Sequence, residues 1–375
     1  MKIPFIKTRN LDFCLGQLKS VLDGKKAVVV GCGKAGIEYH LKPYKTAGIE
    51  VVALCDLNVD LAQREARGND IKHWYASLGE ALEKHDVDVV SICTQPKTHF
   101  ELCKKALDAG VHVLLEKPVT MFRRELDDLD SLLKNAKSKL TVVHNKKFYP
   151  GIMSAKEFFD SGKLGEVLQI DISWITNVER DPFIPHENHW SHQCIGGRWG
   201  EVAPHLLYSA YQFCGEMRLL DVQVRFHDNR WPWLPGDDAS VHLESKNGFV
   251  NLRFGHSHRR FLKENYTDNL NIFGSKGMLI VYPSSCFMLD THKKLGVNLL
   301  PQKRIRDITQ KKYVRDIPSS KTGHDLVVKD FLEHVFLGAL SATPWAEAKH
   351  VMEHTLGIGE ALDRKSGRKR LDPEA

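Results

Sequence analysis

Several features that would point to particular classes of protein are missing from this sequence of 375 residues. No apolar run approaches the roughly 20 residues of a membrane-spanning helix. The N-terminus shows no long apolar segment followed by a small-residue cleavage site, so we expect no secretory signal. Internal repeats and low-complexity tracts are also missing. We therefore expect a cytoplasmic globular protein, with no membrane partner and two or three domains of about 150 residues each.

Paired cysteines and strong charge are missing as well. Eight cysteines are present, but none forms a Cys-x-x-Cys pair. Cys55 and Cys93 lie in apolar runs, where a thiol is usually a small buried apolar group, and this favours a reducing compartment. The net charge is only +6, and part of it lies in the basic stretch 364–370. We interpret that stretch as a solvated end and expect no nucleic-acid partner.

A glycine-rich turn is the most informative feature that is present. Gly31, Gly33 and Gly36 follow the apolar run 27–30 with the spacing G-x-G-x-x-G. In a dinucleotide-binding fold these glycines allow a tight turn, close approach of the backbone to a pyrophosphate, and close packing of helix on strand. Asp56 ends a second apolar run, where its carboxylate can bind ribose hydroxyls and repel the 2′-phosphate of NADP. The pattern predicts NAD as the cofactor, with NADP less favoured; the alternative is a plain glycine turn with a solvated Asp56.

Alternating strand and helix patterns set the fold class. We predict an α/β protein whose Rossmann domain, a doubly wound parallel sheet, spans residues 27–148. A helical extension at 1–26 precedes it, and an α+β domain with a mostly antiparallel open sheet follows at 149–375. The predicted strands are 27–30, 51–55, 87–93, 111–115, 140–144, 166–175, 219–227, 239–246, 248–256, 269–273 and 277–282. The predicted helices are 35–47, 59–67, 77–85, 98–109, 122–136, 152–161, 199–213, 324–338 and 345–362. Residues 283–322 read as an irregular basic arm.

Two motifs carry candidate chemistry. Lys117, in Glu116-Lys117-Pro118, follows a strand and is placed at the edge where doubly wound sheets bind ligands. The alternative is a solvated loop lysine beside a turn proline. Glu201 and His205 are four residues apart in a predicted helix and share a face, so the carboxylate can orient an imidazole that acts as a general base. The alternative is an ordinary helix-surface pair.

The sequence resembles the Gfo/Idh/MocA family of NAD(P)-dependent oxidoreductases, which includes relatives of glucose–fructose oxidoreductase and inositol dehydrogenase. The matching segments, in order from residue 27 to about 282, are GCGKAG, Asp56, Thr94-Gln95-Pro96 with His99, AGVHVLLEKP at 109–118, Asn145 with KFYP at 147–150, GKLG at 162–165, GG-x-x-x-E-x-x-x-H at 196–205, and IFGSKG at 272–277.

The resemblance implies a residue-by-residue site. Lys117 and His205 would be catalytic and would converge from separate domains over the nicotinamide, with Glu201 positioning the imidazole. Hydride would pass between the nicotinamide and a hydroxyl or carbonyl carbon of a sugar, cyclitol or nucleotide sugar. The implied cofactor-binding residues are Gly31, Gly33, Lys34, Ala35, Gly36, Asp56, Leu57, Thr94, Gln95, Pro96, His99, Glu116 and Lys117. The implied substrate-binding residues are Asn145, Lys147, Trp190, His192 and Tyr208. A homodimer or homotetramer, joined through the open face of the second sheet, is also implied.

The chain departs from the family pattern at Glu201, where Asp is usual, at Tyr208, where Asp is frequent, and at Lys147, where Arg is frequent. These departures leave the substrate open. Two other functions fit the same fold: an NAD-dependent glycosidase that uses transient oxidation, and a non-catalytic NAD-binding sensor. His186, His189 and His192 recur every three residues, but we interpret them as a polar or substrate-contacting loop and predict no metal site.

Overall fold

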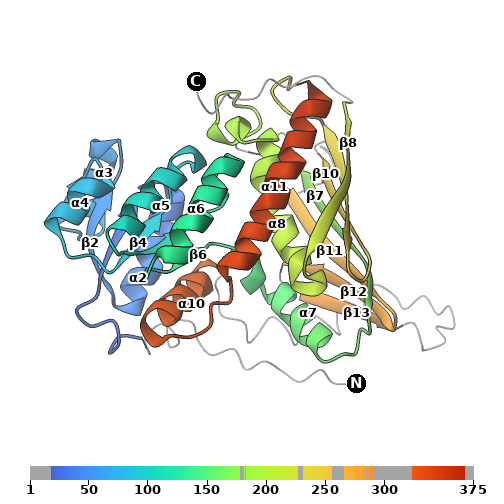
Figure 1. Ribbon diagram of the computed structural model, residues 1–375, viewed down its shortest axis with the longest axis horizontal. Coiled ribbons are helices and arrows are strands. Elements are labelled where there is room, and N and C mark those ends of the chain that lie inside the picture. Colours follow the sequence, from blue (N-terminus) through green and yellow to red (C-terminus); the bar gives the residue numbers. More distant parts are fainter. Residues whose placement is uncertain are drawn as a thin grey trace. The chain divides into compact units, whose positions relative to one another are not determined.

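The computed structural model describes residues 18–177, 181, 183–226, 231–255, 266–283, 285–290 and 323–367. The chain divides into two compact units, which are described separately below (Figure 1). The first unit comprises residues 1–145 and 318–349, and the second comprises residues 146–317 and 350–375. In the described part of the chain, no helix is both long and apolar enough to cross a membrane.

The first unit contains a six-stranded parallel sheet in the order β3-β2-β1-β4-β5-β6. Its strands are β1 (Lys26–Val30), β2 (Glu50–Cys55), β3 (His73–Tyr75), β4 (Val89–Ile92), β5 (His112–Leu115) and β6 (Leu140–Val142). The chain reverses the direction in which it adds strands between β1 and β4, and the carboxyl ends on either side of that point are where such sheets bind ligands. The Rossmann prediction is confirmed. The sequence reading missed β3, which has only three residues and no buried position.

Helices pack around this sheet. They are η1 (Ala35–Leu41), α2 (Lys42–Ala47), α3 (Val59–Gly68), α4 (Leu78–Lys84), η2 (Pro96–Thr98), α5 (His99–Asp108) and α6 (Arg123–Asn135). Asn58 and Ser77 cap α3 and α4, each by accepting a backbone N–H. The first helix was predicted as one α-helix over 35–47, but η1 has π-helical hydrogen bonding before α2 begins.

One later helix belongs to the first unit. α10 (His324–Leu337) contacts α2, η1 and β5, and its buried side chains include Val328 and Phe331 (Figure 1). The predicted second domain, 149–375, therefore differs from the compact units, which place 318–349 with the sheet of the first unit. α11 (Trp345–Ser366) begins in the first unit, where Asp130 accepts hydrogen bonds from Trp345 Nε1 at 2.8 Å and Lys349 Nζ at 2.9 Å.

The second unit contains a seven-stranded sheet in the order β13-β12-β11-β7-β10-β9-β8. Its strands are β7 (Val167–Thr176), β8 (Met217–Arg225), β9 (Asp238–Ser245), β10 (Phe249–Gly255), β11 (Tyr266–Gly274), β12 (Gly277–Tyr282) and β13 (Ser285–Asp290). β7 and β10 pair in parallel, and the other neighbours pair antiparallel, so the predicted mostly antiparallel sheet is confirmed. Residues 283–322 were predicted to be an irregular arm, but residues 285–290 of that range form the strand β13.

The core of the second unit lies between this sheet and the helices α7 (Pro150–Asp160), α8 (Gly197–Cys214) and α11. β7 from Ile170 onward and the whole of β9 show why, because every second residue there is buried while the alternate residues are only partly buried. Trp199 of α8 and Phe254 of β10 are among the largest fully buried side chains. The centroids of these two rings lie 5.3 Å apart.

Some predictions fall outside the described residues. These are most of the N-terminal extension (1–17), the last residue of the predicted strand 248–256, and the arm from 291 to 322. Residues 18–24, where the predicted helix would end, form turns, with Leu22 N–H donating to Leu18 O at 3.0 Å.

Candidate functional site

Each glycine in the glycine-rich loop of the first unit has a separate role. Gly31 has φ +95°, and a Cβ atom there would lie 2.6 Å from the carbonyl oxygen of Cys93, so the turn requires glycine. A Cβ atom on Gly36 would overlap the carbonyl oxygen of Gly31, so η1 can begin this close to the strand only with glycine. At Gly33 a Cβ atom would meet nothing within 4 Å. The space in front of Gly33 is therefore open, as the approach of a pyrophosphate requires.

Asp56 follows β2 and stabilises this loop. Its Oδ2 accepts the backbone N–H of Cys32 at 2.8 Å, and its Oδ1 accepts that of Asn58 at 2.9 Å. The carboxylate thus connects the glycine loop to the start of α3, at the place where ribose hydroxyls bind in this fold. Leu57, the next residue, has 87% of its surface exposed.

The turn after β5 carries Lys117, and the Lys117–Pro118 peptide bond is cis. The Glu116 carboxyl is buried, and its Oε1 lies 3.2 Å from His40 Nε2. Burial alone would raise the pKa of Glu116, but the hydrogen bond from His40 and the charges of His324, His40 and Lys117 lower it to about 2. Glu116 is therefore an ionised, buried carboxylate directly before the candidate catalytic lysine.

His99 is fully buried and connects two loops at this edge. Its Nδ1 lies 2.8 Å from the carbonyl oxygen of Pro118, and its Nε2 lies 3.1 Å from that of Thr94. Burial lowers its pKa, while the two carbonyl contacts oppose that shift. The sequence predicted His99 as a cofactor ligand, and the structure gives it a role in holding the Thr94 and Pro118 backbones together.

All the residues predicted to bind the cofactor belong to the first unit, at or near the carboxyl ends of β1, β2, β4 and β5. The open face of Gly33, the helix start at Lys34 and Ala35, and the acidic Asp56 fit a dinucleotide by shape and by charge. Thr94 Oγ1 bonds Thr98 Oγ1 at 2.7 Å, which fixes the loop that continues through Gln95 and Pro96. The shape and charge of this edge therefore suit the binding of NAD.

In the second unit, α8 carries both Glu201 and His205. The carboxylate of Glu201 forms a buried ion pair with Arg198, one turn earlier on the helix. Arg198 Nη2 also lies 3.3 Å from Asp181 Oδ2, so one guanidinium joins two buried carboxylates. The sequence predicted Glu201 as the partner that orients His205, and the structure shows Arg198 as a strong partner of this carboxylate.

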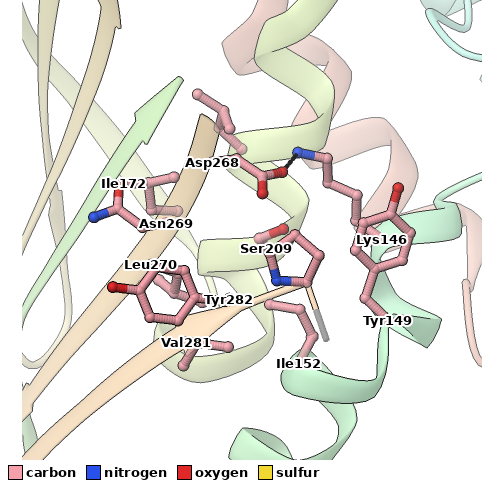
Figure 2. A pocket seen from close by; sticks show the side chains of 12 residues that line it. Lys146, Tyr149, Ile152, Ile172, Ser209, Asp268, Asn269, Leu270, Val281 and Tyr282 are labelled. Atoms are coloured by element: carbon pink, nitrogen blue, oxygen red, sulfur yellow. Dashed lines mark hydrogen bonds and ion pairs between the residues drawn. The ribbon is translucent and has the colours of Figure 1, made fainter. Parts of the chain in front are cut away.

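His205 lies against an aromatic and charged cluster. Its ring is parallel to that of Trp174 on β7, with centroids 6.4 Å apart and an interplanar angle of 8°. Lys146 Nζ lies 4.2 Å from the centre of the same Trp174 ring and forms a buried ion pair with Asp268 on β11 (Figure 2). The ring of Trp174 therefore contacts both the candidate base and a buried cation.

Figure 2 shows the small pocket beside this ion pair, with Tyr149, Ser209 and Tyr282 around it. Its volume of about 20 Å³ is room for about one water molecule. It is too small for a sugar, and the second unit therefore presents no closed sugar pocket at this place.

The predicted substrate residues lie in three separate places. Lys147 Nζ lies 5.7 Å from the centre of the Tyr208 ring, so these two are neighbours. Trp190 and His192 belong to another segment, η4 (Trp190–Gln193), and His192 is buried with Nε2 3.0 Å from the Phe183 carbonyl oxygen. Asn145 is buried and is the last residue of the first segment of the first unit.

Sequence reasoning missed several residues that surround the candidate site. The spacing of Arg198 and Glu201 was a readable signal, because residues three apart on a helix are neighbours. Lys146, Asp268 and His324 gave no signal, because their partners are distant in the sequence. No group of three His, Cys, Asp or Glu side chains is placed to hold a metal ion in the part of the chain that the structure describes.

Comparisons with known proteins agree with this architecture. Residues 25–146 match the oxidoreductase family with an NAD-binding Rossmann fold, and residues 152–280 match the GFO/IDH/MocA C-terminal domain. An uncharacterized oxidoreductase, YhhX of Escherichia coli, is 33% identical over 144 residues, which are 38% of this chain and 41% of that protein. The chain spans between 40% and 60% of the length of the curated relatives it matches first.

Two solved structures share the fold. The oxidoreductase TM0312 of Thermotoga maritima has a TM-score of 0.73 at 20% identity, over 92% of this chain and 97% of that one. A levoglucosan dehydrogenase, solved with NADH and levoglucosan, has a TM-score of 0.72 at 16% identity, over 92% of this chain and 97% of that one. With the two family matches together covering more than half of the sequence, the chain belongs to the Gfo/Idh/MocA oxidoreductases, and its N-terminal part is an NAD-binding Rossmann domain.

Proposed function

We propose that the chain is an NAD-dependent dehydrogenase that oxidises a CH–OH group of a polyhydroxylated substrate, such as a sugar, a cyclitol or a nucleotide sugar. The observation that carries the proposal is the edge of the first unit. There the open space at Gly33, the carboxylate of Asp56 and the lysine after β5 follow three parallel strands of one sheet, β1, β2 and β5. The levoglucosan dehydrogenase of the same fold supports the substrate class.

The protein's own residues would divide the work as follows. His205 accepts the proton of the reacting hydroxyl, and because its Nδ1 is buried, Nε2 is the nitrogen that takes it. The ammonium of Lys117 stabilises the alkoxide that develops as this proton leaves. When bound, NAD⁺ supplies the acceptor for the hydride, so the alcohol loses one proton and one hydride and becomes a carbonyl.

The surrounding residues keep these groups in place. We propose that Glu201 acts through Arg198, because a fork of buried charge–charge hydrogen bonds holds the first turns of α8. Trp174 flanks the His205 ring, and the two rings are parallel. Asn145, Lys147, Trp190, His192 and Tyr208 remain proposed substrate contacts.

Leu57 and Asp56 would serve the adenosine half of the cofactor. The exposed leucine offers apolar surface to a base, and the carboxylate favours two free ribose hydroxyls over a 2′-phosphate. A homo-oligomer in the cytoplasm also remains part of the proposal. Size-exclusion chromatography with light scattering tests the oligomer directly.

The deciding experiment follows NADH absorbance with a panel of sugars, inositols and nucleotide sugars. We expect one class to reduce NAD⁺, and we expect Lys117→Ala and His205→Ala each to lower kcat by about 10²–10⁴-fold. Lys104→Ala is the control, since Lys104 pairs with Asp108 on the surface of α5. Glycoside cleavage without net NADH would indicate the glycosidase alternative. NAD⁺ binding with no turnover of any kind would indicate a sensor and refute the proposal.

A further inference from the structure

The residue before Lys117 is held by two histidines that are far apart in the sequence. Glu116 Oε1 lies 3.2 Å from His40 Nε2, on η1, and 3.7 Å from His324 Nε2, at the first residue of α10. Its other oxygen, Oε2, accepts the backbone N–H of Lys117 at 3.2 Å. The same carboxylate thus contacts two imidazoles and the main chain of the candidate catalytic lysine.

Both histidines are themselves held in place. His40 Nδ1 lies 2.9 Å from Ser91 Oγ, and the Ser91 hydroxyl donates to Tyr44 Oη at 2.8 Å. The His324 ring stacks on Tyr39, with centroids 4.3 Å apart and an interplanar angle of 12°. His40, Ser91 and Tyr44 are almost completely buried. Neither imidazole can leave Glu116 without breaking a second contact.

Consecutive residues of η1 supply half of this arrangement. Tyr39 stacks on one histidine, and His40 is the other. In a π-helix the turn is wider than in an α-helix, and such turns are frequent at functional sites. The local helix type therefore contributes to the placement of both contacts.

The surroundings of Glu116 show what the two imidazoles contribute. A buried carboxylate that lacks compensating charge is costly and tends to neutralise. The titratable groups that interact with Glu116 include His40 from η1, His324 from α10, Lys117 from its own turn, His99 from α5 and the Cys93 thiol after β4. Burial raises the pKa of the Cys93 thiol, so that group stays neutral. The two histidines and the lysine therefore keep the carboxylate ionised.

Stability alone is a poor explanation for such a cluster. Replacing a buried charged pair by apolar side chains is often neutral or stabilising. Here the cluster adjoins Lys117 on one side, while His99 fixes the carbonyl of Pro118 on the other. Lys117 is thus the residue whose backbone is fixed from both directions.

We propose that His40 and His324 are positioning residues that act through Glu116 to hold Lys117 in the geometry that the nicotinamide half of NAD requires. The inference rests on the proposed function, in which Lys117 acts at that half of the cofactor. It makes α10, which comes more than 200 residues after the glycine loop, a part of the cofactor site. It also gives Glu116 a role other than direct contact with the cofactor.

The test uses a pair of variants at His324. His324→Phe keeps a ring to stack on Tyr39 but removes the ring nitrogen that lies 3.7 Å from Glu116, whereas His324→Gln keeps a polar N–H group and loses the ring. Affinities for NAD⁺ and for ADP-ribose, which lacks the nicotinamide, are measured by calorimetry. A lost contact to a charged group predicts that His324→Phe weakens NAD⁺ binding about tenfold and changes ADP-ribose binding less than about twofold. We expect His324→Gln to restore most of the NAD⁺ affinity.

Turnover separates this inference from the function on which it rests. On a substrate from the panel, we expect His324→Phe to lower kcat about tenfold alone and by less than about twofold in a Lys117→Ala background, because the two changes act on one group. Equal weakening of NAD⁺ and ADP-ribose binding, or an unchanged NAD⁺ affinity in a folded His324→Phe protein, would overturn the inference. If Lys117→Ala itself leaves turnover intact, the proposed function fails instead. Thermal unfolding of each variant verifies that it is folded.

Discussion

The two glycines of the loop that differ most in their surroundings allow a sharp test of the cofactor site. Gly33 does not have a positive φ, and a Cβ atom there would meet nothing within 4 Å. Alanine at Gly33 therefore costs nothing in the unliganded protein. It reduces the freedom of the unfolded chain, so we expect Gly33→Ala to raise the free energy of unfolding by about 0.4–1 kcal/mol. For a unit of this size that is an increase in Tm of about 1–4 °C.

Gly36→Ala should have the opposite sign. Its Cβ atom would overlap the carbonyl oxygen of Gly31 and approach Val29 Cγ1 to 3.3 Å. A backbone atom cannot rotate away as a flexible side chain can, so the helix must shift on the strand. Overpacking of this kind costs about 1–3 kcal/mol, which corresponds to a fall in Tm of about 2–12 °C.

The assay is urea unfolding by circular dichroism without NAD, together with titration calorimetry of NAD⁺. We expect Gly33→Ala to be the more stable protein and yet to bind NAD⁺ at least about tenfold more weakly, a loss of about 1.4 kcal/mol, because the new methyl group occupies the path of the pyrophosphate. Natural NAD⁺ affinity in Gly33→Ala, or destabilisation as large as that of Gly36→Ala, would show that the pyrophosphate does not pass this glycine.

Three further predictions concern charge. Burial lowers the pKa of His350 to about 4, and its Nε2 accepts the Met217 N–H. The stability that this neutral ring contributes is complete above pH 6.5 and is lost as the pH falls through 4. The midpoint of urea unfolding should therefore fall over that pH range, and it should fall less in His350→Gln. Asp130→Asn should lower the free energy of unfolding by about 1–2 kcal/mol, because the carboxylate accepts hydrogen bonds from Trp345 and Lys349. Asp128 forms only an exposed pair with Arg124 at 3.8 Å, so Asp128→Asn should leave thermal unfolding almost unchanged. Asp56→Ser should raise the affinity for NADP⁺ relative to NAD⁺ at least about tenfold in calorimetry, and an unchanged ratio would contradict the assignment of Asp56 to the ribose.

Much of the fold was readable from local patterns. The strands of the first sheet include short apolar runs such as Val28–Val30 that are buried on both faces. Glycines at 31, 48 and 110 mark several of the boundaries between strands and helices, so the strand pattern and the turn signals agree there. β3 gave no such signal because His73 is exposed and the strand has only three residues. The π-helical turn of η1 was equally hidden, since hydrogen-bond spacing depends on packing against Ser91 and Glu116 rather than on propensity.

The parts of the candidate site that belong to sequence motifs could be predicted from the sequence. The glycine loop, Asp56 and Lys117 follow strands directly, so their places follow from the topology. Glu201 was assigned to His205 by helical spacing and by the family motif, and neither shows that Arg198 pairs with the same carboxylate. His324 could not be connected with Glu116 from the sequence, because the contact depends on where α10 packs.

The division of the chain has a practical consequence for anyone who expresses the cofactor domain alone. A fragment that stops at residue 145 contains every strand of the Rossmann sheet and nonetheless lacks α10, whose Val327, Phe331 and Leu332 are buried. Such a fragment would expose the apolar surface of α2, η1 and β5 that this helix covers, and it would present Glu116 with one imidazole instead of two. A soluble and competent minimal domain would have to carry residues 318–349 as a grafted segment, joined through a designed linker to the end of β6.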